Sequence, residues 1–165
     1  MNLILAFKYL LLIAFIGVSL AAYSQSKDKK SEANLVLDKV GNLPEVLKFM
    51  HETPKSAEPR MFLDGEPDST INYYRVKVGI SNFDVMRSNF IFYVKPKTLK
   101  IYYWDVLDYD NSLITLHLWR SWRDKPEWKK LHIYKNGKLI VISDKMLKKL
   151  RPADKPLFMP CDGCE

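Results

Sequence analysis

The 165-residue sequence lacks the patterns that most enzymes and metal proteins need. It has six glycines, which form neither a glycine-rich phosphate loop nor the paired glycines of a nucleophile elbow. Its three histidines, His51, His117 and His132, lie in separate segments, and none stands at a metal-ligand spacing from another histidine or a cysteine. The sequence therefore predicts no catalytic residue, no metal site and no cofactor.

Three aspartates, Asp105, Asp108 and Asp110, come closest to a calcium loop. Counted from Asp108, however, the sixth position is not glycine, and Trp119 stands at the twelfth, where a bidentate glutamate is needed. We expect an aspartate-rich turn between strands. The alternative is an envelope hydrolase that uses one of these aspartates with a histidine brought near by folding.

Cysteine is almost absent, since Cys161 and Cys164 are the only two. Glu165 follows them in place of the histidine of a haem attachment site, and no helix can follow to lower a thiolate pKa. We expect a disulfide in an oxidising compartment, with a two-thiolate half-site for a shared metal as the alternative. A loop this short should contribute little to global stability.

A long apolar run occurs only near the N-terminus. Residues 9–18 are apolar after Lys8, and the small residues Ala22 and Ser24 precede Gln25. This layout predicts a secretory signal peptide over residues 1–24 and an exported protein of the periplasm, cell envelope or exterior. The alternative is an uncleaved signal that anchors the protein in the membrane. The apolar run is, however, shorter than the ~20 residues that a spanning helix needs.

The remainder is expected to form one domain with an extended tail. Residues 25–32 are polar and lysine-rich, which predicts a disordered lead. Residues 33–151 are predicted to form a single α+β domain. Residues 152–165 contain three prolines, which predict an extended tail that ends in the Cys-x-x-Cys motif.

A helix is predicted from apolar residues at intervals of four, three, four and three. This stripe, which we expect to be core, comprises Val36, Val40, Leu43, Leu47 and Met50. Gly41, Asn42 and Pro44 interrupt it. Asn42 is predicted to cap a second helical piece that carries Pro44 in its first turn. We therefore expect a bent or two-piece helix packed on the inner face of a sheet.

Alternating apolar residues predict an antiparallel sheet of about four strands. The four segments are residues 60–63, 73–80, 89–94 and 99–104. The first is predicted as an edge strand, and the third is apolar on both faces, which favours a central position. Pro96 in the tight link 95–98 favours a hairpin between the last two strands, whereas residues 81–87 form a looser link.

Beyond this sheet, an added β-hairpin and short helices are predicted. Thr115 is expected to cap a short helix, although residues 114–118 also alternate like a strand. The Asn-Gly pair at 136–137, between two β-rich runs, is typical of a two-residue type I′ hairpin. Asp144 is predicted to cap a last short helix that runs to Leu150.

The pattern resembles small secreted bacterial proteins of the PepSY-like and cystatin-like class. The resemblance is carried by the secretion signal, Leu43-Pro-Glu-Val46, residues 73–79 and 89–105, and Leu118-Trp-Arg120. It implies a helix lying across an antiparallel sheet, and proteins that act by binding or inhibiting other proteins. It transfers no individual functional residue, and residues 121–165 lie outside it.

The chain has a net charge of +7, and its positive charge is concentrated in residues 116–151. This segment contains eleven Lys and Arg and three acidic residues. An exported protein seldom meets nucleic acid, so we expect a protein or an anionic envelope polymer as partner. The alternative is a solvated face that serves only solubility.

These observations favour a non-catalytic binding module. Its candidate binding residues are aromatic or basic and fall into two sets. The outer sheet face contributes Tyr73, Arg75, Lys77, Ile91, Tyr93, Lys100, Tyr102 and Trp104, and the basic region contributes Arg120, Arg123, Lys129 and Lys130. The alternative for the first set is that the added hairpin covers the aromatic face.

Overall fold

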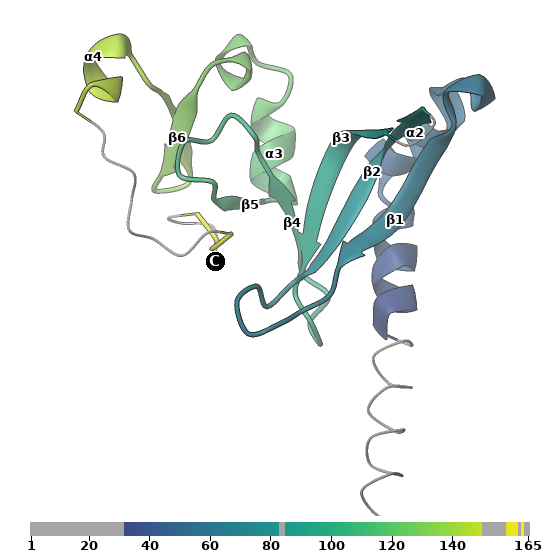
Figure 1. Cartoon of the computed structure of the whole chain (residues 1–165). Helices are drawn as coiled ribbons and strands as arrows, with labels where there is room; N and C mark the ends of the chain where they lie inside the picture. The colour runs from purple at the N-terminus through teal and green to yellow at the C-terminus, as the bar shows by residue number, and fades with distance from the viewer. Residues whose placement is uncertain (1–31, 83–84, 150–157, 162, 164–165) are drawn as a thin grey trace, which may run out of the picture. The chain divides into compact units, whose positions relative to one another are not determined.

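The computed structural model describes residues 32–82, 85–149, 158–161 and 163 (Figure 1). The predicted signal peptide and residues 25–31 lie outside them. The chain divides into two units, residues 1–35 and 36–165. In the first unit the described residues, 32–35, are helical. Among the described helices, none has the length and apolar character needed to span a membrane.

The predicted two-piece helix is confirmed. Residues 32–41 are helical, and α2 (Pro44–Glu52) follows with Pro44 in its first turn. The predicted cap is wrong, because Leu43 occupies the N-cap position of α2 and forms no side-chain cap. Asn42 instead donates its Nδ2 to the carbonyl of Asp38, at 2.7 Å, and so closes the end of the first piece.

The predicted apolar stripe is only partly core. Val36 and Val40 are fully buried, but Leu47 and Met50 are 53% and 38% exposed. Val46 takes the buried position on α2, with 1% exposure. The break at residues 42–43 rotates the second piece about its axis, so a single helical phase cannot run through both pieces.

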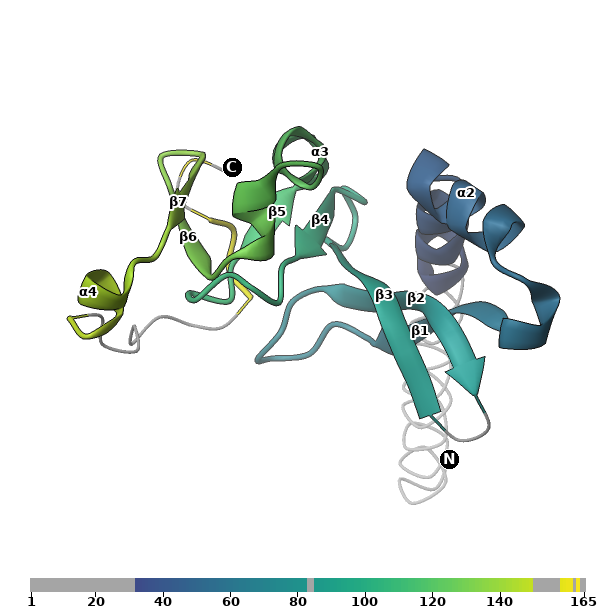
Figure 2. The same cartoon turned by 90° about the horizontal axis from the view of Figure 1, so that it is seen from above.

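Five antiparallel strands form one sheet in the order β1-β2-β3-β4-β5, one more strand than expected (Figures 1 and 2). They are β1 (Pro59–Gly65), β2 (Tyr74–Asn82), β3 (Val85–Val94), β4 (Ile101–Trp104) and β5 (Leu113–Thr115). The predicted edge position of β1 and the antiparallel pairing of β3 with β4 are confirmed. A short 3₁₀ helix, η1 (Lys55–Ala57), precedes β1.

The predicted loose link between β2 and β3 is wrong, because the strands stay paired as far as Asn82 and Val85. The register shifts between Val78 and Gly79. A Cβ at Gly79 would overlap the carbonyl oxygen of Arg87, so only glycine fits this bulge.

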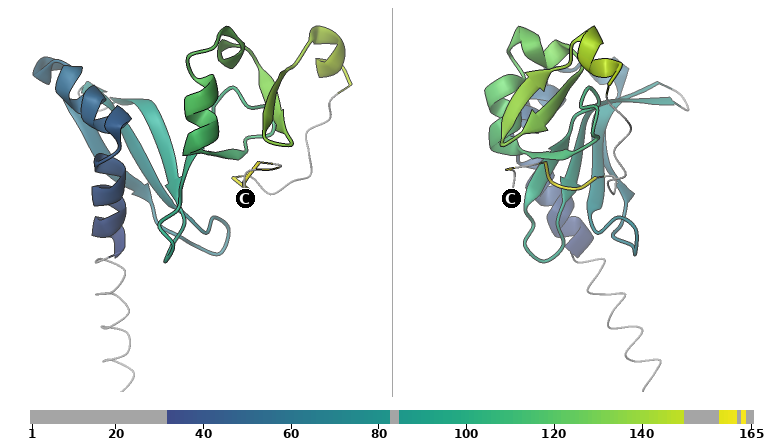
Figure 3. Two further views of the ribbon diagram at one scale, coloured as in Figure 1. Left: turned by 180° about the vertical axis from the view of Figure 1, so that it is seen from behind. Right: turned by 90° about the vertical axis from the view of Figure 1, so that its left-hand side faces the viewer.

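The sheet is covered on one face by α2 and by α3 (Leu116–Trp122), whose arrangement Figure 3 shows. Thr115 caps α3 as predicted, with its Oγ1 accepting a hydrogen bond from the Leu118 amide at 3.2 Å. Trp119 of α3 stacks on Tyr103 of β4, with ring centroids 4.4 Å apart. Phe49 of α2 meets Phe90 of β3 edge to face. Aromatic rings therefore fill much of this core.

The predicted Asn-Gly hairpin is confirmed as β6 (His132–Lys135) and β7 (Lys138–Val141). Asn136 and Gly137 have φ of 49° and 67°, the positive values that a type I′ turn needs. A 3₁₀ helix, η2 (Pro126–Lys129), precedes the hairpin, and α4 (Asp144–Leu147) follows it. Ser143, not Asp144, caps α4, by accepting from the Met146 amide.

Part of the predicted extended tail is packed against the sheet. Leu113 of β5 donates its amide to the Met159 carbonyl at 2.8 Å, and its carbonyl accepts from the Cys161 amide at 2.9 Å. Cys161 is 4% exposed and disulfide-bonded. The predicted partner, Cys164, lies outside the described residues, so the pairing stays a prediction.

Candidate functional site

The aromatic outer face of the sheet is covered. Tyr73, Tyr93 and Tyr102 are 9%, 1% and 3% exposed and cluster with Leu113. Phe158 of the tail stacks on Tyr93 with centroids 5.0 Å apart. Ile91 and Trp104 pack against the same cluster. The tail therefore covers part of this face, for which the sequence offered cover by the hairpin as an alternative. These tyrosines reach a partner only if the cover is removed.

Two of the three predicted cations on the outer sheet face are neutralised by one carboxylate. Both Arg75 and Lys77 form ion pairs with Asp64 of β1, the latter at 3.1 Å from Nζ to Oδ2. Lys100 remains exposed, with its Nζ 5.1 Å from the centre of the Tyr102 ring. Of the three predicted sheet-face cations, Lys100 is thus the one that faces solvent and forms no ion pair within the described residues.

The arginines of the basic region are also paired. Arg120 Nε lies 2.8 Å from Glu45 Oε1, and Arg123 Nη1 lies 3.0 Å from the same oxygen. The hydrogen bond from Arg120 is the main cause that lowers the pKa of Glu45. The Arg123 guanidinium also lies 4.9 Å from the Trp119 ring centre. Both arginines therefore join α3 to α2 rather than facing outward as free cations.

Exposed lysines remain, and we call them the basic surface. They are Lys125, Lys129, Lys130, Lys135, Lys138, Lys145, Lys148 and Lys149. Within the described part of the chain, none of them forms an ion pair. Lys125 places its Nζ 4.0 Å from the Trp122 ring centre. Leu131, Ile140 and Leu147, 37%, 36% and 43% exposed, are interspersed with the lysines along the chain.

An aspartate and a histidine do come together, but inside the protein. Asp105, just after β4, and His132, at the start of β6, are 2% and 0% exposed. His132 Nε2 lies 2.7 Å from Asp105 Oδ2, and the Tyr134 hydroxyl donates to the same oxygen at 3.0 Å. The other ring nitrogen, Nδ1, lies 2.6 Å from the Lys130 carbonyl oxygen. We call these three side chains the buried triad.

The buried triad is satisfied by its own hydrogen bonds. Asp105 Oδ1 accepts from the Leu107 amide at 3.0 Å, so both carboxylate oxygens are occupied. Asp108 nearby accepts from the Asp110 and Ser112 amides and is 2% exposed. Burial is the main cause that raises the pKa of Asp108. These carboxylates close the turn, as expected, and leave little capacity for a cation.

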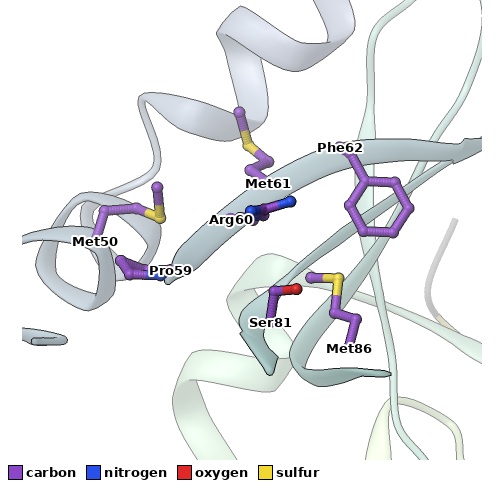
Figure 4. A pocket seen from close by; sticks show the side chains of 7 residues that line it. All are labelled: Met50, Pro59, Arg60, Met61, Phe62, Ser81 and Met86. Carbon is purple, nitrogen blue, oxygen red and sulfur yellow. The ribbon is translucent and has the colours of Figure 1, made fainter. Parts of the chain in front are cut away.

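A cavity of about 430 Å³ lies around the start of β1 (Figure 4). Its lining comes from α2, β1, β2 and β3 and comprises Met50, Pro59, Arg60, Met61, Phe62, Ser81 and Met86. The one charged side chain, Arg60, is paired with Glu58 at 2.6 Å. The methionines make the lining adaptable and mostly apolar, and it selects no ligand class.

The described residues contain no group of three or more histidine, cysteine or acidic side chains placed to hold a metal ion. Comparisons with family models, curated proteins and solved structures found no match for this chain. The site must therefore be interpreted from its own residues.

Sequence analysis missed the buried triad. A signal was present, because His132 and Tyr134 occupy alternate positions in a β-rich run and so share one face. Two polar side chains on the inward face of a strand need buried partners. Their partner, Asp105, is 27 residues away from His132, a distance at which no local pattern operates.

Proposed function

We propose that this chain is an exported, non-catalytic binding module whose basic surface contacts an anionic polymer of the cell envelope. The observation that carries the proposal is the contrast between two sets of cations. Arg75, Lys77, Arg120 and Arg123 are paired with Asp64 or Glu45. The exposed lysines of the basic surface are not paired within the described residues.

Unpaired lysines suit a polymer with repeated negative charges. Each ammonium is a hydrated point charge on a flexible stem, which tolerates irregular spacing of phosphate or carboxylate groups. Residues 125–149 carry eight lysines and two acidic residues, so the field of this surface is positive. The hairpin β6–β7 and α4 lie next to each other (Figures 1 and 3). Three of the lysines lie on these elements, and two more directly follow α4.

The hydrolase alternative is disfavoured by access. His132 has no exposed area, and an oxygen atom lies within hydrogen-bond distance of each ring nitrogen. A general base must reach the proton that it removes, directly or through one water. His117 is exposed on α3, and among the described residues it forms no hydrogen bond or ion pair with Asp105, Asp108 or Asp110.

The fold supports the resemblance to the PepSY-like and cystatin-like class in its general layout. A two-piece helix and an antiparallel sheet are present, as that class requires. We retain this membership, and export through the N-terminal signal, as parts of the proposal. The resemblance implies proteins that act by binding or inhibiting other proteins, and the proposal takes from it the binding role alone.

Replacing Lys129, Lys130, Lys148 and Lys149 with glutamine is expected to abolish retention on heparin and leave the fold intact. These four side chains are exposed, so their removal costs little stability. Binding by wild type should weaken steeply with salt, because the Debye length is about 8 Å at physiological ionic strength. Retention is measured on a heparin column at several salt concentrations.

The matched control replaces Lys39, Lys48, Lys55 and Lys95 with glutamine. This variant loses the same charge from exposed positions outside the basic surface. It should keep most of the retention. If both variants lose retention equally, net charge alone is responsible, and if neither does, the basic surface is only a solvated face. A partner protein would be indicated instead if envelope pull-down by wild type resists high salt.

A further inference from the structure

The hairpin β6–β7 is attached to the loop between β4 and β5 through His132. The His132 amide donates to the Leu107 carbonyl at 3.1 Å, and the Tyr109 amide donates to the His132 carbonyl at 2.8 Å. An isolated two-stranded hairpin is marginally stable in water. The placement of β6–β7, which carries Lys135 and Lys138 of the basic surface, therefore depends on contacts such as those of His132.

The hydrogen bonds of the triad place a hydrogen on Nδ1 of His132 and suit a second one on Nε2. The Lys130 carbonyl oxygen can only accept, so Nδ1 carries a hydrogen. The Tyr134 hydroxyl donates to Asp105 Oδ2, and Nε2 lies 2.7 Å from the same oxygen, so one hydrogen is shared between Nε2 and the carboxyl group. With that hydrogen on Nε2, the ring carries a positive charge opposite the carboxylate. The arrangement is that of a buried imidazolium paired with a carboxylate.

The charged groups around His132 favour this form. Asp105 and Asp108 face it from the loop after β4, Tyr134 faces it from its own strand, and Trp128 of η2 contributes a ring without a titratable group. Burial lowers the pKa of His132, but the hydrogen bonds to Asp105 and Lys130 and the charges of Asp105 and Asp108 outweigh it and raise the pKa above 6.5. Burial is also the main cause that raises the pKa of Tyr134, which keeps its hydroxyl protonated.

We propose that protonated His132 is a latch that holds the β6–β7 hairpin against the β4–β5 loop, so that Lys135 and Lys138 join the rest of the basic surface only while His132 carries its proton. The effect on polymer binding rests on the proposed function, but the effect on the hairpin does not. When Nε2 loses its proton, its lone pair faces the Asp105 carboxylate, and a buried negative charge is left without its partner.

The direction of the pH dependence follows from this arrangement. The pKa of His132 is raised on folding, so its contribution to stability is complete below the unfolded value of about 6.5. That contribution is lost as the pH rises through the folded-state value. Hairpin order and heparin binding should therefore fall together on the alkaline side.

The test uses the full chain and follows three signals from pH 5 to 10 at constant ionic strength. NMR reports the titration of the His132 ring and, through the Ile133 and Ile140 methyl signals, the order of the hairpin. Heparin is the binding probe. We expect one common midpoint for the three signals and a loss of heparin affinity of about tenfold, equivalent to about 1.4 kcal/mol.

Two variants separate a latch from a merely structural contact. Asp105→Asn removes the charge that holds the proton, so the midpoint should move to lower pH. Tyr134→Phe removes a competing donor to the same oxygen, so the midpoint should move to higher pH, and this variant keeps the test informative if the first one does not fold. His117→Gln, at an exposed position on α3, is the matched control and should leave the midpoint unchanged.

A hairpin that stays ordered while His132 titrates would overturn the latch, whatever heparin does. So would a His132 signal in wild type that does not titrate up to pH 10. A hairpin that loosens at the His132 midpoint, in a protein that does not bind heparin at any pH, would support the latch and refute the proposed function.

Discussion

Replacing Trp119 with alanine is expected to reduce the free energy of unfolding by about 3–5 kcal/mol. Trp119 is 3% exposed and stacks on Tyr103, with an angle of 7° between the ring planes. Phe90 and Phe92 meet it edge to face, at 5.7 and 5.9 Å. Truncation would leave a cavity between α3 and the sheet that these rigid rings cannot fill. The loss is large against a total stability of about 5–15 kcal/mol.

Urea unfolding followed by far-UV circular dichroism measures this loss without relying on the fluorescence of the replaced residue. Trp122→Ala is the matched control, because Trp122 lies on the same helix but is only partly buried. Its ring contacts the Lys125 ammonium, a cation–π interaction worth about 0.5–1 kcal/mol at exposed sites. Equal losses from the two variants would show that Trp119 does not anchor α3 to the sheet.

Elements with a strong local pattern could be predicted from the sequence. The alternation of Val76 and Val78 with Arg75 and Lys77 placed β2 and its inner face correctly. The Asn-Gly pair placed the β6–β7 hairpin, because its positive φ angles are a local requirement. Thr115 likewise marked the start of α3 through a hydrogen bond within one turn.

Prediction failed where a small local change altered a longer pattern. The spacing from Leu43 to Met50 continued the apolar stripe, yet the break at residues 42–43 turned Leu47 and Met50 outward. Spacing alone does not register such a rotation, since it assumes one uninterrupted helix. Similarly, residues 81–87 were predicted to form a looser link, but the strands stay paired beyond the bulge as far as Asn82 and Val85.

The candidate site depends on contacts between distant residues, which sequence patterns do not encode. Arg120 and Arg123 were candidate binding residues because they lie in a basic segment. Their partner, Glu45, is 75 and 78 residues away. Asp105 and His132 are also distant in sequence, and they meet because the fold brings β6 against the loop after β4. The lysines of the basic surface were identifiable as basic, but only the structure distinguishes them from the paired arginines.

Replacing Phe158 with alanine is expected to destabilise the protein by about 2–3 kcal/mol, somewhat below the 3–5 kcal/mol typical of a fully buried phenylalanine. Phe158 is partly buried, stacks on Tyr93 and meets Trp104 edge to face at 5.7 Å. Its φ of 61° lies in the left-handed region, which costs an L-residue about 1–2 kcal/mol. Packing against the sheet must therefore outweigh this strain, and truncation removes the packing and keeps most of the strain.

Thermal and urea unfolding of Phe158→Ala and Met159→Ala measure the effect at neighbouring positions. Met159 is 51% exposed, so its truncation should change stability by less than about 0.5 kcal/mol. Truncation after Pro160 should also lower stability, because it removes the buried Cys161 and its hydrogen bond to Leu113. Truncation of a free tail would leave stability unchanged. If Phe158→Ala is as stable as Met159→Ala, Phe158 does not pack firmly on the aromatic face of the sheet. Tyr73, Tyr93 and Tyr102 would then regain their standing as candidate binding residues, because the aromatic face beneath would be open to a partner.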